Sequence, residues 1–251
     1  RKTEQFENAM AGFSFLIKAF QPEAVMACAT AAMRNAGNGD EICRKVLEKT
    51  GIQIRIIDGK QEARILFRNK PAGIGGGDQV HFMFIDVGGG STEITIFSDG
   101  RAVESKSFNI GTIRVLKQMP LDDVWQDMEL WISDRTKAFE GIQAIGSGGN
   151  INKLFRLAGG KMGKPASRQS LVRMKNKLQN MSFEERMKKY SLRPDRADVI
   201  VPGSEIYLKV MKWAGCKRIH VPLRGLADGM IRILHEQHTQ NPDTGGNALG
   251  K

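Results

Sequence analysis

The sequence predicts an α/β protein made of two related units, the first of which lacks the three strands that open the second. Three observations lead to this prediction. Helical and strand spacings of apolar residues alternate along the chain. A glycine-rich segment with neither spacing, residues 71–78, separates residues 1–72 from residues 73–251. The strands and helices of the first part also follow the same order as those at the end of the second part.

The first part reads as helix, strand, helix, strand, helix. Its opening helix is indicated by apolar residues three or four positions apart, from Phe6 to Phe20. Asp40 can cap the next helix, and Gly51 can end it. Alternating β-branched residues indicate the second strand. The expected elements are helix 3–20, strand 24–29, helix 40–49, strand 52–57 and helix 61–69.

The second part opens with three strands. The turn Gly88-Gly89-Gly90 joins the first to the second, and Asp99-Gly100, a strong hairpin signal, joins the second to the third. Helices and strands then alternate to the end of the chain. The expected elements are strands 81–87, 91–97 and 101–110, helix 121–139, strand 142–145, helix 150–157, a basic helical stretch, helix 204–213, strand 218–221 and helix 226–236.

This comparison of the two parts predicts a known architecture. A duplicated unit of three strands followed by βαβ segments is the RNase H-like unit of the actin-like ATPase superfamily, in which a phosphate site lies in the cleft between the units. We therefore expect two such domains, 1–72 and 73–251, with a cleft between them and with the opening strands of the first domain absent.

Composition narrows the class of protein. The chain of 251 residues is 41% hydrophobic and 26% charged, as expected for a globular protein with a large core. No apolar run approaches the ~20 residues of a membrane-spanning helix. The three cysteines are far apart, which argues against a disulfide framework or a structural zinc site. Because no secretory signal begins the sequence, we expect a cytoplasmic protein without membrane contact.

The positive charge is concentrated in one stretch. The net charge is +11, and Lys153–Arg196 contains thirteen basic residues but only three acidic ones. Such a field attracts polyanions, although a solvated helical face with no partner explains the charge equally well. RNA binding, with Phe155, Phe183 and Tyr190 as stacking residues, is the least favoured reading because no RNA-binding motif accompanies them.

Two glycine-rich turns predict phosphate binding. In the first, Asp86 ends an apolar strand, Gly88, Gly89 and Gly90 let backbone amides point at an anion, and Ser91 and Thr92 add hydroxyl groups. Asp86 and Glu93 supply the oxygen ligands that Mg²⁺ prefers. A plain glycine hairpin is the structural alternative. In the second, Gly146, Ser147, Gly148 and Gly149 lead from a strand into a helix, where a tight turn is an equal alternative.

Four segments resemble the exopolyphosphatase and guanosine pentaphosphate phosphohydrolase family (Ppx/GppA) in order and spacing. They are Ala29–Asn38, Ile56–Ala63, Ile85–Glu93 and Val201–Glu205. The resemblance covers nearly the whole chain, and it implies the actin-like fold, a Mg²⁺ cofactor and, by analogy, a homodimer.

The resemblance also implies roles for single residues. Glu62, at the second Glu of the family's Glu-Glu-Ala motif, corresponds to the general base; taken alone it would be only a carboxylate near a helix N-terminus. Arg34 corresponds to an arginine facing the phosphate, and Asp86 to the residue that positions Mg²⁺.

The sequence departs from the family pattern in several places. Gln61 replaces the first Glu of the pair, Ala227 stands where an Arg is usual, and Asn150 stands where a Thr often follows the second glycine turn. The family's N-terminal Asp-x-Gly-Ser-Asn-Ser loop does not occur in this sequence.

The predicted reaction is metal-assisted hydrolysis of a phosphoanhydride. Glu62, across the predicted cleft, would activate water for attack on the terminal phosphate of inorganic polyphosphate or guanosine pentaphosphate. The basic stretch would hold the rest of the polyanion. The main alternative is a regulatory module that binds polyphosphate or guanosine polyphosphates without hydrolysing them, and the departures motivate it. A sugar or acetate kinase is disfavoured because Ala29–Arg34 and Glu62 match the phosphohydrolases.

Overall fold

The computed structural model describes residues 2–68, 81–99 and 101–240, which form two compact units. The first unit comprises the described residues of Arg1–Arg68 and Leu226–Lys251, and the second comprises those of Asn69–Gly225. The glycine-rich segment at which we expected the domain boundary falls in 69–80, outside the described residues.

The last helix departs from the predicted division. Helix α12 (Leu226–Gln240) groups with the first unit and not with the second, because it packs against α4 (Gly59–Phe67). Gly229 permits this contact, since a Cβ atom there would lie only 2.2 Å from the carbonyl oxygen of Ile65. The predicted range 73–251 therefore joins one helix to the wrong unit, a packing choice that the order of elements along the chain does not encode.

A pair of parallel strands organises the first unit. Strand β1 (Ala27–Ala29) pairs with β2 (Ile54–Ile56), and α1 (Lys2–Phe20) packs against α3 (Gly39–Thr50). A short helix, α2 (Ala31–Arg34), follows β1 directly. Gly51 ends α3 in the left-handed conformation, as expected, with φ of 72°. The predicted cap at Asp40 is wrong, because Asp40 lies inside the helix and Asn38 precedes it without a side-chain cap.

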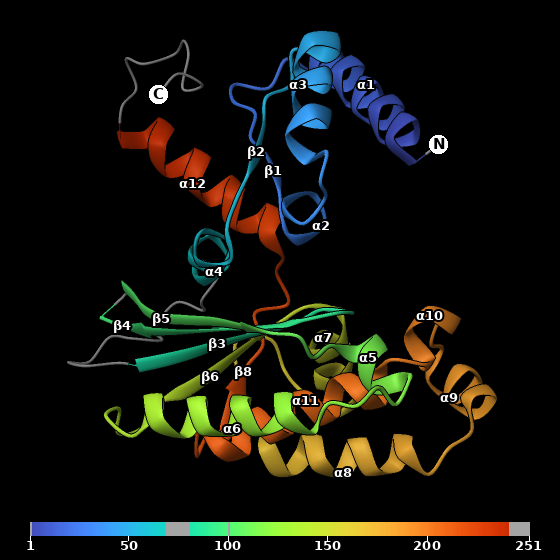
Figure 1. Ribbon diagram of the computed structural model, residues 1–251, viewed down its shortest axis with the longest axis vertical. Helices are drawn as coiled ribbons and strands as arrows, with labels where there is room; N and C mark the ends of the chain where they lie inside the picture. The colour runs from blue at the N-terminus through green and yellow to red at the C-terminus, as the bar shows by residue number, and fades with distance from the viewer. Residues whose placement is uncertain (1, 69–80, 100, 241–251) are drawn as a thin grey trace. The chain divides into compact units, whose positions relative to one another are not determined.

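A mixed sheet forms the centre of the second unit (Figure 1). Its strand order is β5-β4-β3-β6-β8-β7, with β3, β6 and β8 parallel and β4, β5 and β7 antiparallel to their neighbours. This is the predicted arrangement of three opening strands followed by βαβ segments. The strands are β3 (His81–Val87), β4 (Thr92–Ser98), β5 (Arg101–Phe108), β6 (Gln143–Ser147), β7 (Ala166–Ser167) and β8 (Arg218–His220).

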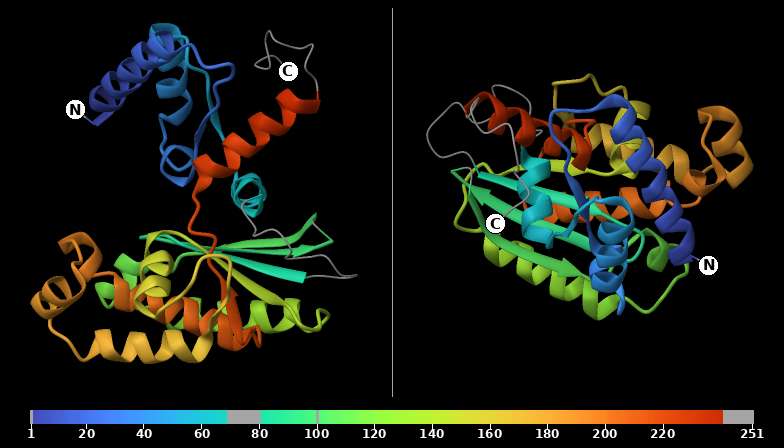
Figure 2. Two further views of the ribbon diagram at one scale, coloured as in Figure 1. Left: turned by 180° about the vertical axis from the view of Figure 1, so that it is seen from behind. Right: turned by 90° about the horizontal axis from the view of Figure 1, so that it is seen from above.

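Helices cover one face of this sheet. Within this unit, α6 and α11 lie against the strands, and α8 packs on α11, as the two opposite views in Figures 1 and 2 show. The basic stretch Lys153–Arg196 includes the second half of α7, the short strand β7, helices α8 and α9 and most of α10, so its predicted, mainly helical character is confirmed. The helices are α5 (Thr112–Leu116), α6 (Asp122–Thr136), α7 (Gly149–Leu157), α8 (Arg168–Gln179), α9 (Phe183–Tyr190), α10 (Pro194–Ala197) and α11 (Ile200–Trp213).

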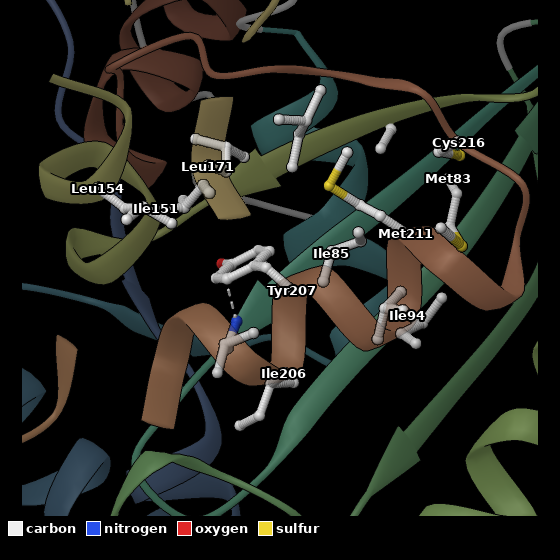
Figure 3. Packing of buried hydrophobic residues seen from close by; sticks show 14 of the residues in the cluster. Met83, Ile85, Ile94, Ile151, Leu154, Leu171, Ile206, Tyr207, Met211 and Cys216 are labelled. Atoms are coloured by element: carbon white, nitrogen blue, oxygen red, sulfur yellow. Dashed lines mark hydrogen bonds between the residues drawn. The ribbon is translucent and has the colours of Figure 1, made fainter. Parts of the chain in front are cut away.

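The core of the second unit lies between the sheet and these helices. Ile85 of β3, Ile151 of α7 and Met211 of α11 are fully buried in it, and Tyr207 lies among them (Figure 3). The apolar runs that predict the strands therefore supply the buried face. No helix within the described ranges has the length and apolar character required to cross a membrane.

Candidate active site

Three polar residues meet where neighbouring strands of the second unit end. Asp86 of β3 pairs in register with Glu93 of β4 on one side and with Ser147 of β6 on the other. Residues in register on neighbouring strands direct their side chains to the same face of a sheet. The sequence signals at 86–93 and 146–149, which are far apart along the chain, thus form one cluster in space.

The first glycine turn is held by backbone hydrogen bonds. The amide of Gly88 donates to the carbonyl of Ser91 over 2.9 Å, which closes the turn. The carbonyls of Gly88 and Gly89 accept from the first amides of α5, and Arg114 Nε donates to the carbonyl of Gly90 over 2.8 Å. The carbonyl groups of the turn are therefore engaged on its α5 side.

Gly111 is a residue of this site that sequence reasoning missed. A Cβ atom at this position would lie 2.5 Å from the carbonyl carbon of Gly89 and 2.6 Å from the nitrogen of Gly90. Only glycine allows the start of α5 to approach the turn so closely. The pair Ile110-Gly111 between a strand and a helix was the available signal, but a single glycine at such a junction is common.

The predicted hydroxyl donors divide into two groups. Thr92 is fully buried, and its hydroxyl donates to the carbonyl of Ile110 over 2.6 Å, so it ties β4 to the segment before α5. Ser91 is partly exposed, and its hydroxyl donates to Glu93 Oε1 over 2.7 Å. Ser107 donates to the same carboxylate oxygen over 3.1 Å. Ser91 and Glu93 therefore lie together at the turn, whereas Thr92 has a structural partner.

The second glycine turn contacts the first cluster. Gly148 has φ of 104°, which favours glycine, and a Cβ atom there would lie 3.2 Å from Asp86 Oδ1. Gly149 begins α7 beside Arg196, since a Cβ atom would lie 2.6 Å from Nη1. Gly146 is buried in β6, where a side chain would collide with Ile151 and Ile219. Gly148 and Gly149 are thus placed near the polar cluster, and Gly146 serves packing.

Tyr207 supports both strand ends from beneath. Its hydroxyl donates to the carbonyl of Ser147 and accepts from the amide of Val87 over 3.3 Å, the bond drawn in Figure 3. Complete burial raises the pKa of this phenol well above its usual value, and the nearby charge of Asp86 acts in the same direction. Sequence reasoning missed Tyr207 because an aromatic residue in an apolar helix usually has only a packing role in the core.

In the first unit, Arg34 and Glu62 lie on helices that follow the two parallel strands. Arg34 ends α2, after β1, and Glu62 lies in the first turn of α4, after β2. The carboxyl ends of parallel strands share one edge of a sheet, the usual location of a site in α/β proteins. Arg34 Nη1 also donates to the carbonyl of Ile57 over 2.7 Å, which fixes its side chain beside the segment that leads to α4.

Gln61 retains a structural function despite its departure from the family pattern. Asp58 Oδ1 accepts from the amide of Gln61 over 2.7 Å, and Gln61 Oε1 accepts from the amide of Asp58 over 3.1 Å. This is a capping box, in which glutamine serves as well as glutamate. The start of α4, and with it the backbone of Glu62, is therefore specified without the missing carboxylate.

The residues around Asp86 fit a magnesium ion that also binds phosphate. Two carboxylates directly opposite each other repel, and a cation between them would remove that cost. Mg²⁺ takes one or two carboxylates and completes its shell with water and phosphate oxygens. Within the described part of the chain, no three His, Cys, Asp or Glu side chains are grouped to hold a metal, so Asp86 and Glu93 do not belong to an all-protein cage.

The structure thus brings together two sets of predicted residues, each within one unit. Arg34 and Glu62 form one set, and Asp86, Glu93, Ser91 and the two glycine turns form the other. The predicted cleft between the units stays a prediction.

Comparison with known proteins identifies relatives over nearly the whole chain. A model of the Ppx/GppA phosphatase family matches residues 1–238. The chain is 24% identical to exopolyphosphatase 1 of Mycobacterium leprae over 227 residues, which is 82% of this chain and 67% of that protein. It is 25% identical over 216 residues to a bifunctional 3-dehydroquinate synthase/phosphatase of Fusobacterium nucleatum, which is 76% of this chain and 32% of that protein.

Solved structures share the fold. The Ppx/GppA family member of Aquifex aeolicus superposes with a TM-score of 0.75 at 24% identity, over 94% of this chain and 82% of that one. An exopolyphosphatase of Cytophaga hutchinsonii gives 0.74 at 19% identity, over 94% and 82% of the two chains. The predicted fold of the Ppx/GppA proteins is therefore confirmed.

Proposed function

The chain belongs to the Ppx/GppA phosphatase family and is a hydrolase, and we propose that it releases the terminal phosphate of inorganic polyphosphate or of guanosine pentaphosphate. The observation that carries this proposal is the cluster at the ends of β3, β4 and β6. There, two carboxylates, Asp86 and Glu93, adjoin two glycine-rich turns, and in the second of these Gly148 lies beside Asp86.

The roles in this proposal follow from the chemistry of phosphoryl transfer, which requires charge neutralisation, positioning and an activated water. Asp86 and Glu93 would hold Mg²⁺, and the amides of Gly89, Gly90 and Ser91 would hold the terminal phosphoryl group, while the amide of Gly88 closes the turn. Mg²⁺ would neutralise charge on the phosphate oxygens. The family as a whole supports a divalent metal, and the choice of Mg²⁺ rests on the carboxylate ligands.

Glu62 would orient the attacking water and take up its proton, and the guanidinium of Arg34 would pair with phosphate oxygens. Its hydrogen bond to Ile57 holds the Arg34 side chain in place before substrate binds. The capping box at Asp58 and Gln61 supports the same role for Glu62, because it fixes the first turn of α4.

Substitution of Glu62 by Gln in the full-length protein tests the proposal. We expect kcat for phosphate release from polyphosphate and guanosine pentaphosphate to fall about 10²–10⁴-fold, the usual contribution of a general base. Glu48→Gln, on the exposed surface of α3, is the matched control and should retain full activity. Undiminished release by Glu62→Gln would contradict the assigned role. Tight binding of both polyanions without release by the wild-type protein would favour the regulatory module.

A further inference from the structure

A pocket of about 280 Å³ lies beside the second glycine turn, within the second unit. It is formed by residues along α7 from Gly149 to Arg156 and by the segment from the end of α9 to α10. Four of its lining side chains are basic, and none is acidic. The lining residues are Gly149, Asn152, Lys153, Arg156, Ser191, Leu192, Arg193 and Arg196.

Three of the four basic side chains at the pocket form hydrogen bonds with neighbouring groups. Arg196 Nη1 donates to Asn150 Oδ1 over 3.3 Å and lies against Gly149. Lys153 Nζ donates to the carbonyl of Tyr190 over 3.2 Å. Arg193 is the exception to this excess of positive charge, since it forms a two-bond ion pair with Asp195.

The other three cations lack an acidic counterpart. Among the ion pairs that join described residues, none involves Lys153, Arg156 or Arg196. Like charges gathered around one cavity repel each other, and an anion in that cavity removes the repulsion.

We propose that this pocket binds a phosphate or diphosphate group of the substrate that is not the one being hydrolysed. The inference rests on the proposed function, because it places a second subsite next to the first. Gly148, which contacts Asp86, and Gly149, which lines the pocket, are consecutive residues, so the two subsites adjoin. The sequence predicts only a diffuse attraction of polyanions to the basic stretch. Four of the thirteen cations of that stretch line this one pocket, which gives the attraction a defined location.

Two substrates could supply this group, namely the next phosphates of a linear polyphosphate and the 3′-diphosphate of guanosine pentaphosphate. The double variant Lys153→Gln/Arg156→Gln tests the pocket with each of them, because neither cation has an acidic partner among the ion pairs of the described residues. The double variant Arg173→Gln/Lys177→Gln is the matched control, since both residues are exposed on α8, lie outside the pocket and remove the same charge.

We expect the pocket variant to bind at least one of the two polyanions about 10-fold or more weakly by isothermal titration calorimetry, because each charged hydrogen bond is worth a substantial factor in affinity. KM for that substrate should rise in parallel while kcat stays unchanged. The control variant should change affinity less than about 2-fold. A selective loss for polyphosphate or for guanosine pentaphosphate identifies the source of the bound group, and either loss supports the pocket.

Equal weakening by the pocket and control variants would show diffuse attraction and overturn the proposal, as would unchanged binding of both ligands. Urea unfolding curves of the two variants establish that both are folded. Binding and hydrolysis are measured separately. A wild-type protein that binds but releases no phosphate therefore contradicts the proposed function while the comparison of variants still decides the pocket.

Discussion

At the scale of the residue, the role of a side chain depends on the partner that the fold gives it. Ser91 and Thr92 are adjacent hydroxyl residues in one motif. The hydroxyl of Ser91 contacts Glu93 at the turn, whereas that of Thr92 donates to Ile110 in the core. The hydroxyl of Thr92 therefore has a structural role, and substitution of Thr92 should lower stability.

Asp86→Asn removes the central carboxylate and leaves its size unchanged. We expect phosphate release to fall about 10–100-fold, because loss of a group that positions a metal commonly costs this much. Added Mg²⁺ should restore part of the rate if the loss reflects metal affinity. Activity is measured as released phosphate across a magnesium titration. Asp99→Asn, at an exposed turn, is the control, and a loss of the same size in it would contradict a special role for Asp86.

Cys216 predicts a loss of stability at alkaline pH. Burial raises the pKa of its thiol from 9.0 to about 12. Above pH 9 the unfolded thiol loses its proton while the folded one keeps it, so the folded state binds more protons and the free energy of unfolding falls as pH rises. Between pH 8 and pH 10 this group alone should cost about 1.4 kcal/mol.

Urea unfolding of the wild type and of Cys216→Ala at both pH values measures this cost. The variant loses packing at every pH, so the relevant quantity is its smaller decrease between pH 8 and pH 10. An identical decrease in the two proteins would show that Cys216 does not titrate differently in the folded and unfolded states.

At the scale of the element, the strands and helices that the sequence predicts best are the long ones with a clear run or period of apolar residues. Strand β3 matches the predicted range 81–87 residue for residue, because a long apolar run between polar segments leaves little ambiguity. Strands β1 and β2 are half as long as predicted, since only three residue pairs are in register. The elements α2, α5 and β7 were missed because two to five residues are too few to show a period.

The capping box formed by Asp58 and Gln61 should stabilise the start of α4 whether residue 61 is neutral or charged. Asp58→Ala removes the side-chain acceptor for the amide of Gln61 and should destabilise the protein by about 0.5–2 kcal/mol. Asp58→Asn, which keeps the acceptor, should retain most of the stability, and Gln61→Glu should be nearly neutral. Urea unfolding gives the free energies. A Gln61→Glu variant as unstable as Asp58→Ala would contradict the pairing seen here.

At the scale of the whole molecule, the site motifs could be recognised in the sequence, but some of the residues that hold them in place could not. The motif at 86–93 and the turn at 146–149 were found from residue type alone. They lie together because β3, which ends in this motif, pairs with β4 on one side and with β6 on the other. Tyr207 and Gly111 were missed because their function consists of contacts with residues distant in the chain. The placement of α12 and the expected homodimer also depend on surfaces that a linear pattern does not describe.

The uneven charge of the molecule predicts a strong dependence on salt. A polyanion bound by several cations loses affinity as counterions screen them, with a Debye length of about 10 Å at 0.1 M and about 3 Å at 1 M. We expect KM for long polyphosphate to rise several-fold between 0.05 and 0.5 M NaCl, with a smaller change in kcat. Initial rates across that range provide the measurement, and a KM independent of salt would contradict binding through the basic stretch.

The contact between Gly111 and the turn has a thermodynamic consequence. Because α5 rests directly on the peptide between Gly89 and Gly90, the turn loses its conformational freedom when the protein folds. A ligand that binds there meets a surface already ordered and need not restrict three flexible glycines itself. The entropy cost of ordering this turn is therefore part of the free energy of folding, and binding of each substrate molecule does not include it.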